Sequence, residues 1–306
     1  MRLKIIIGFP LKILLLAVIS LIVWIIASGV FISVETTPEM TSNASQVIVA
    51  MLIVMLAFTL SLSYMILRSA WSGWRLALIV FAVFFGIYSF NSQIEAWYFK
   101  DALQLPMSLI YGIVATGFIQ TLIFSPLAVW LLGKMKKEDA QGTIPPITKM
   151  PFAELLIKLG VLAVIVYPAL YFLFGYFVLW QEPAARLLYS GSEELLGFFP
   201  HFANTFGGDP WLWPWQIFRA FIWIGIAWPI MRMSKGLWWE TGIIVGLQFA
   251  ILMNAVHILP NPYMPAAVRA AHFWETATSN FILGFVIVWF LHRHHTSITD
   301  FFSFKQ

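Results

Sequence analysis

Long apolar runs are the feature that most constrains what this chain can fold into. Eight stretches of roughly 20 residues or more carry almost no charge, and a helix rises 1.5 Å per residue, so each can cross the ~30 Å core of a bilayer. The predicted spans are 13–34, 46–67, 76–95, 106–132, 154–179, 210–231, 238–259 and 265–291. We therefore expect an all-α protein, a polytopic transmembrane helix bundle of about eight spans.

The composition agrees with a membrane protein and excludes several kinds of site. Of 306 residues, 60% are hydrophobic and only 10% are charged, against about 25% charged in a typical soluble domain. The sequence has no cysteine, which excludes disulfides, thiol nucleophiles, zinc–thiolate sites and iron–sulfur clusters. A bound metal would need His, Asp or Glu. We expect the lipid bilayer as a partner, and no nucleic acid.

The first apolar run has two interpretations. It follows a short basic start with Arg2, Lys4 and Lys12, as a secretory signal peptide would. The apolar region of a signal peptide is usually about 7 to 15 residues long, and this one is longer, which favours a retained membrane anchor. The small residues Ala27, Ser28 and Gly29 leave cleavage open.

The distribution of Lys and Arg indicates the orientation of the spans. Loops at the cytoplasmic surface carry most of the Lys and Arg in membrane proteins. Here the basic residues concentrate in alternate segments, beginning with the N-terminus and ending with the tail 292–306. The basic residues outside these segments are Lys100, Arg186, Arg219 and Arg269. This alternation predicts a cell-membrane protein with both termini in the cytoplasm.

Two polar segments divide the chain. The linker 133–150 contains Pro145 and Pro146 and separates a first group of four spans, 1–132, from a second group, 151–306. The segment 181–209 lies between spans five and six and is the longest outer segment. Within it, the run from Ser190 to Glu193 resembles a capping box, which predicts a short helix through Phe199. We expect this outer segment to lie over the bundle.

Three predicted spans each bring a polar pair toward the outer surface. The members of each pair are three or four residues apart, so they share a helix face. The pairs are Asn91 with Glu95, Asn254 with His257, and His272 with Glu275; Arg269 lies one turn before the last pair. Polar and ionisable groups are costly in hydrocarbon, so each pair needs a structural or functional reason.

One hypothesis is a metal site made by His257, His272, Glu275 and Glu95. Neutral imidazole and carboxylate suit one divalent ion such as zinc, iron or manganese, and an open position on the ion would activate water. No spacing such as H-E-x-x-H supports it. The competing interpretation is that Glu95, His257, Arg269 and Glu275 pair with one another and fix helix packing. A third is a path for a substrate or for protons.

Two classes of function follow from these interpretations. The first is a membrane enzyme with a site near the outer leaflet that acts on a lipid or lipid-linked substrate. Its catalytic residues would be Glu95, His257, His272 and Glu275. Arg219, Arg269 and Asn254 would bind the substrate, because arginine pairs readily with anionic groups. The second class is a transporter of small molecules or protons, or a non-catalytic subunit of a membrane assembly.

Overall fold

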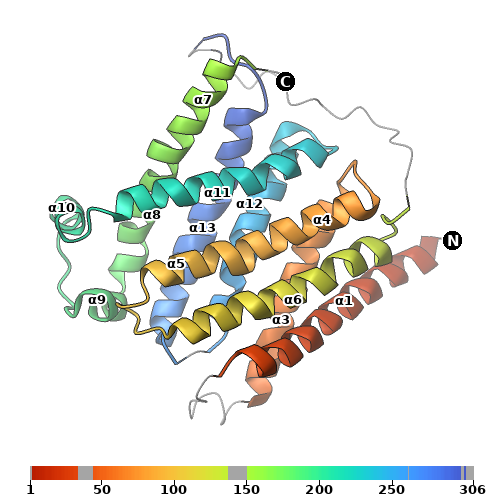
Figure 1. Cartoon of the computed structure of the whole chain (residues 1–306), viewed down its shortest axis with the longest axis horizontal. Coiled ribbons are helices and arrows are strands. Elements are labelled where there is room, and N and C mark those ends of the chain that lie inside the picture. The colour runs from red at the N-terminus through yellow and green to blue at the C-terminus, as the bar shows by residue number, and fades with distance from the viewer. Residues whose placement is uncertain (1, 34–43, 137–149, 261, 298–299, 301–306) are drawn as a thin grey trace.

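The computed structural model describes residues 2–33, 44–136, 150–260, 262–297 and 300. In this part of the chain the secondary structure is helical and contains no β-strand. Seven helices in it are long and apolar enough to cross a membrane. The chain is therefore a multi-pass, helical protein of the membrane type (Figure 1).

The first group of helices precedes the linker. Its elements are α1 (Arg2–Phe31), α3 (Ala44–Leu67), α4 (Gly73–Phe84), the π-helix η1 (Phe85–Asn91), α5 (Ser92–Tyr98) and α6 (Met107–Leu131). α4, η1 and α5 join into one continuous span. α1 packs beside α6 and α3, as Figure 1 shows. Glycine permits this close approach, because a Cβ on Gly112 would lie 2.3 Å from the carbonyl oxygen of Phe31.

The second group follows the linker and contains the outer segment. Its elements are α7 (Phe152–Val161), the π-helix η2 (Leu162–Val166), α8 (Tyr167–Phe177), the 3₁₀ helix η3 (Leu179–Gln181), α9 (Pro183–Ser190), α10 (Phe198–Gly208), α11 (Leu212–Met233), α12 (Trp238–Asn254), the 3₁₀ helix η4 (Ala255–Ile258) and α13 (Ala266–Leu291). α7, η2, α8 and η3 form one span. Figure 1 shows α9 and α10 at the end of the bundle away from the N-terminus.

The closest helix pair is α12 with α13, and glycines make this approach possible. A Cβ on Gly284 would lie 2.7 Å from the Cα and the backbone nitrogen of Gly246. On Gly242, a Cβ would come within 2.8 Å of the Phe285 ring. Small residues at such crossings let two backbones approach within van der Waals contact. The crossing holds the polar residues of α12 and α13 next to one another.

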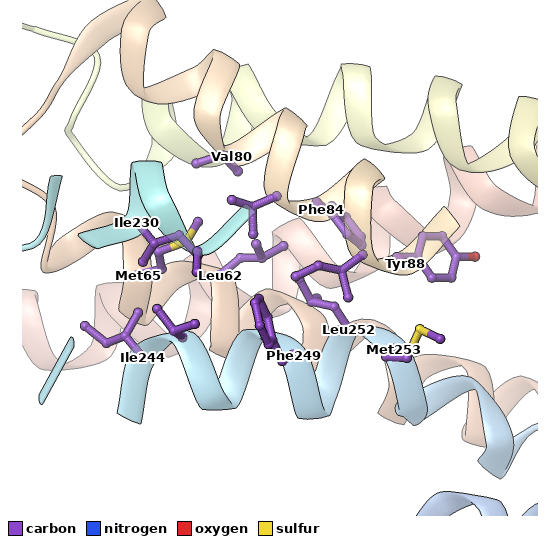
Figure 2. Packing of buried hydrophobic residues seen from close by; sticks show 14 of the residues in the cluster. Leu62, Met65, Val80, Phe84, Tyr88, Ile230, Ile244, Phe249, Leu252 and Met253 are labelled. Atoms are coloured by element: carbon purple, nitrogen blue, oxygen red, sulfur yellow. The ribbon is translucent and has the colours of Figure 1, made fainter. Parts of the chain in front are cut away.

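A continuous apolar core lies between both groups of helices. Side chains from α3, α4, η1, α11 and α12 interdigitate in it (Figure 2). Phe84 packs edge-on against Phe58 at a ring-centroid distance of 5.4 Å, and Trp223 lies 4.3 Å from Phe249. The contact of α11 and α12 with α3 and α4 makes the two groups parts of one packed bundle.

Three basic loops meet at one end of the bundle, here called the basic end. The backbone N–H of Lys235 donates to the carbonyl of Arg68 at 2.9 Å, and that of Gly73 donates to the carbonyl of Lys134 at 2.8 Å. The side chain of Arg68 also pairs with Glu240 at 2.6 Å. The structure thus gathers at one end loops that the charge pattern assigned to one side.

Some sequence-based boundaries need correction. The capping-box prediction was wrong: α9 ends at Ser190, Gly191 takes φ +73°, and the next helix, α10, begins only at Phe198. A left-handed glycine ends a helix rather than starting one. The predicted sixth span coincides with α11 but is not among the seven apolar spans. Much of the linker (137–149) and tail (298–299 and 301–306) lies outside the described residues.

Candidate functional site

The end of the bundle opposite the basic end, here called the site end, contains a buried ion pair. Arg219 of α11 donates two hydrogen bonds to Glu95 of α5, both 2.8 Å long, and a third to Gln216 at 3.0 Å. Arg219 is 2% exposed. Its fork geometry matches a carboxylate, so the charges of Arg219 and Glu95 balance one another.

A second buried polar chain runs from α9 to α13. The hydroxyl of Tyr189 lies 2.8 Å from Nε2 of His272, and Nδ1 of the same ring lies 2.8 Å from Oε2 of Glu275. The side chain of Glu275 is 6% exposed. A carboxylate that accepts from Nδ1 holds the imidazole in one orientation and leaves Nε2 as its basic nitrogen.

The Tyr189 hydroxyl has a proton available for this hydrogen-bond chain. Burial, together with the nearby Glu275 and Glu95, raises the pKa of the Tyr189 hydroxyl well above its usual value. Tyr189 therefore keeps its proton and can donate it to Nε2. In the tautomer that accepts this hydrogen bond, Nδ1–H donates to Glu275.

His257 and Asn254 support the dyad from α12 and η4. The ring of His257 stacks on that of His272 at a centroid distance of 5.7 Å, and its Nδ1 lies 3.2 Å from the carbonyl of Asn254. The side-chain oxygen of Asn254 accepts a hydrogen bond from Thr276 on α13. These contacts connect the end of α12 to the face of α13 that carries His272.

A small cavity is lined by members of both polar groups. Its volume is about 20 Å³, room for about one water molecule. The lining residues are Glu95, Tyr167, Leu170, Tyr171, Arg219, Met253, Glu275, Thr276, Ser279 and Asn280. Both carboxylates predicted from the sequence thus line one small cavity.

The elements around this cavity depart from regular α-helix. The π-helix η1 precedes Glu95, the π-helix η2 precedes Tyr167, and both pack against α11, which carries Arg219. An extra residue per turn re-aims the side chains that follow, and single π-turns occur often at functional sites. Pro168 is the second residue of α8, which directly follows η2.

The outer segment covers the site through α9. Glu182 caps this helix by accepting from the backbone N–H of Ala184 at 3.1 Å. Arg186 donates to the carbonyls of Trp180 and Glu193, which anchors both ends of the helix. α9 then packs on the start of α13, where Tyr189 meets His272. α10 instead packs its aromatic face beside α8, with Phe172 and Phe202 at a centroid distance of 5.2 Å.

The structure brings the predicted site residues together in part. His257, His272 and Glu275 form one group, and Glu95 and Glu275 both line the cavity. Among the described residues, no three or more His, Asp or Glu side chains are arranged to hold a metal ion. Arg269 donates to the carbonyl of Met264 at 2.8 Å and does not line the cavity.

Sequence reasoning missed several residues of this site. Ser279 and Asn280 were recognisable, because they continue the helix face of His272, Glu275 and Thr276 with spacings of three and four. Tyr189 and Tyr171 were not recognisable: their contribution depends on how α9 and α8 rotate. Asn91 was expected beside Glu95, but it lies buried outside the cavity lining, and neither polar atom of its side chain has a partner within the described residues.

Comparisons with known proteins identify no relative. No family model, curated protein or solved structure matches the chain. The geometry of the site is therefore the only basis for a function.

Proposed function

We propose that this chain is a multi-pass membrane enzyme that hydrolyses a lipid or lipid-linked substrate, with the Glu275–His272 dyad as its general base. The observation that carries the proposal is the hydrogen-bond chain from Tyr189 through His272 to Glu275. A base oriented by a carboxylate, with its second nitrogen aimed at a hydroxyl, is the arrangement that general-base catalysis requires.

The Tyr189 hydroxyl marks where the reacting group would bind. When α9 moves aside, a water molecule can take the place of this hydroxyl, 2.8 Å from Nε2. His272 would remove a proton from that water, whose oxygen bonds to an ester carbonyl carbon. The bond to the leaving alcohol then breaks, and His272 returns its proton to the alcohol oxygen. Glu275 stabilises the imidazolium that forms between these steps.

The location of the site supports a substrate from the bilayer. His272 lies one to two turns inside α13. It is covered by α9, which belongs to the outer segment. Phe199 on that segment and Trp211 just after it are 79% and 73% exposed, and aromatic side chains favour the level of the lipid headgroups. A substrate with an apolar chain would stay in the bilayer while its ester reached the dyad.

The orientation is part of the proposal: α11 is counted as a span, which brings the total to eight, and the basic end faces the cytoplasm. The chain has no cysteine, so a single introduced cysteine reports its own side of the membrane. Ser192 precedes α11 and Lys235 follows it. In intact cells, an impermeant maleimide should label Ser192→Cys and leave Lys235→Cys unlabelled. Labelling with the opposite preference would reverse the orientation, and labelling of both would show that α11 does not cross the membrane.

Hydrolysis is tested by isotope incorporation. Wild-type protein in liposomes of phosphatidylethanolamine, phosphatidylglycerol and a polyprenyl-linked ester is incubated in H₂¹⁸O, and the lipids are measured by mass spectrometry. We expect ¹⁸O in a carboxylate product of the wild-type protein. The rate of its formation should fall at least 100-fold in His272→Ala and Glu275→Gln. Glu194→Gln, the same change at an exposed carboxylate, should keep full activity. Equal product from Glu275→Gln would exclude the dyad as the base.

A specific observation also favours a second function, transport of protons or a small molecule. The paired Glu95 and Arg219 lie next to the cavity with Glu275, as titrating groups on a conduction path would. If the wild-type protein is folded and forms no product from any of these lipids, the hydrolase proposal is wrong. A transporter or a non-catalytic subunit of an assembly then becomes the better proposal.

A further inference from the structure

With histidine counted as neutral, as in the formal charge of the chain, the carboxylates around the cavity outnumber the cations. Arg219 compensates Glu95 through two hydrogen bonds of 2.8 Å. Among the described residues, the side-chain hydrogen-bond partner of Glu275 is His272. Arg186 and Arg269, the other arginines at the site end, donate to backbone carbonyls. In this formal count one carboxylate has no cation beside it, in a part of the chain where charge is costly.

Two polar side chains that line the cavity also have atoms without a hydrogen bond. Glu275 uses Oε2 for His272, while Oε1 lies toward α8 and takes part in none of the hydrogen bonds of the described residues. Asn280 is 7% exposed and lines the cavity, and its side chain takes part in no hydrogen bond within the same part of the chain. Neither side chain is among the fully enclosed polar groups without a partner, so both are open to what the cavity holds.

We propose that this cavity binds one sodium ion, with the Glu275 carboxylate and the Asn280 side-chain oxygen as its principal ligands. Ser279, which also lines the cavity, contributes a hydroxyl oxygen. Hard cations prefer oxygen ligands of these kinds, and the cavity has room for one ion of about the size of a water molecule. In the formal count, one monovalent cation balances the single excess carboxylate.

The position of the cavity agrees with an ion site. Asn280 lies near the middle of α13 (Ala266–Leu291), and ion sites of membrane proteins commonly lie near the midplane where helices are irregular. The π-helices η1 and η2 supply that irregularity, because they directly precede α5 and α8, which carry Glu95 and Tyr167 of the cavity lining. This inference does not depend on hydrolysis, because the sodium ligands lie on the side of Glu275 away from His272.

The test measures binding of ²²Na⁺ to detergent-purified protein at constant ionic strength, with choline as the replacing cation. We expect one ion per chain in the wild type and at least a tenfold loss of affinity in Asn280→Ala and Glu275→Gln. Asn204→Ala removes an exposed asparagine from α10 and should bind as the wild type does. Binding also stabilises the folded state, so saturating Na⁺ should raise the Tm by about 5 °C.

Two further variants separate the possible failures. Ser279→Ala is the milder change if Asn280→Ala does not fold, and it should weaken binding several-fold. His272→Ala removes the proposed base but none of the sodium ligands, so it should bind Na⁺ and lack hydrolysis. Folded wild-type protein that binds no ²²Na⁺ would overturn the sodium site. Equal binding by Asn280→Ala and Asn204→Ala would also overturn it.

Discussion

The crossing of α12 and α13 should be the part of the bundle most sensitive to added volume. We predict that Gly284→Ala destabilises the protein, whereas Gly225→Ala, the same change in α11, does not. A Cβ on Gly284 would lie 2.7 Å from the backbone of Gly246, which cannot move aside as a side chain can. A Cβ on Gly225 would meet nothing within 4 Å.

The comparison of these two variants isolates the packing cost. Alanine is favoured over glycine in a helix by about 1 kcal/mol, and this gain applies to both positions. Forcing a methyl group into a packed contact costs about 1–3 kcal/mol. Gly225→Ala should therefore be slightly more stable than the wild type, and Gly284→Ala should be less stable than Gly225→Ala by about 1–3 kcal/mol.

Unfolding by sodium dodecyl sulfate in mixed micelles, followed by tryptophan fluorescence, measures the free energy of unfolding of each variant. A displaced α13 also moves His272 away from His257, so Gly284→Ala should lose catalytic activity while Gly225→Ala keeps it. Equal stability of the two variants would refute the close crossing, and with it the mechanism that holds the polar residues of α12 and α13 together.

Three further predictions concern the free energy of unfolding. Arg219→Met should lower the free energy of unfolding by about 3–5 kcal/mol, because it leaves Glu95 as an unpaired charge. Adding Glu95→Gln to this variant should restore part of the lost free energy in the same unfolding assay. Burial lowers the pKa of His295 to about 4, below its value of about 6.5 in an unfolded chain. Between these pH values the unfolded state binds a proton that the folded state does not. The free energy of unfolding should therefore fall as the pH drops from about 6.5 toward 4, and it should fall less steeply with pH in His295→Gln. Tyr98→Phe removes the hydrogen bonds to Asp209 at 2.7 and 2.8 Å and should cost about 1.5–3 kcal/mol, which thermal unfolding will detect.

The sequence was sufficient to predict the seven apolar spans that the structure supports, because their length and apolar character are local properties. The pairing of His272 with Glu275 was also predictable, since residues three apart on a helix face one another. The structure confirms this pairing. The partner of Glu95 was not predictable in the same way. Arg269 was the expected candidate, yet Arg219 pairs with it, because that choice depends on the rotation and depth of α11 relative to α5.

The outer segment shows where local signals fail. The run from Ser190 to Glu193 has the residues of a helix start, but Gly191 adopts a left-handed conformation and ends α9. The same stretch of sequence can start a helix or end one, and the packing of α9 on α13 decides between the two. Tyr189 reaches His272 only because α9 ends there, so this member of the site follows from tertiary structure alone.

The proposed general base requires that Nε2 of His272 carry no proton, so that it can accept one from water. Nitrogen-15 NMR of histidine-labelled protein near pH 7.5, with His272 assigned by its loss in His272→Ala, measures the protonation of both ring nitrogens. We predict a proton on Nδ1 and none on Nε2, with the Nδ1 signal shifted in Glu275→Gln and the Nε2 signal shifted in Tyr189→Phe. A doubly protonated ring, or a His272 spectrum that neither substitution changes, would contradict the proposed general base.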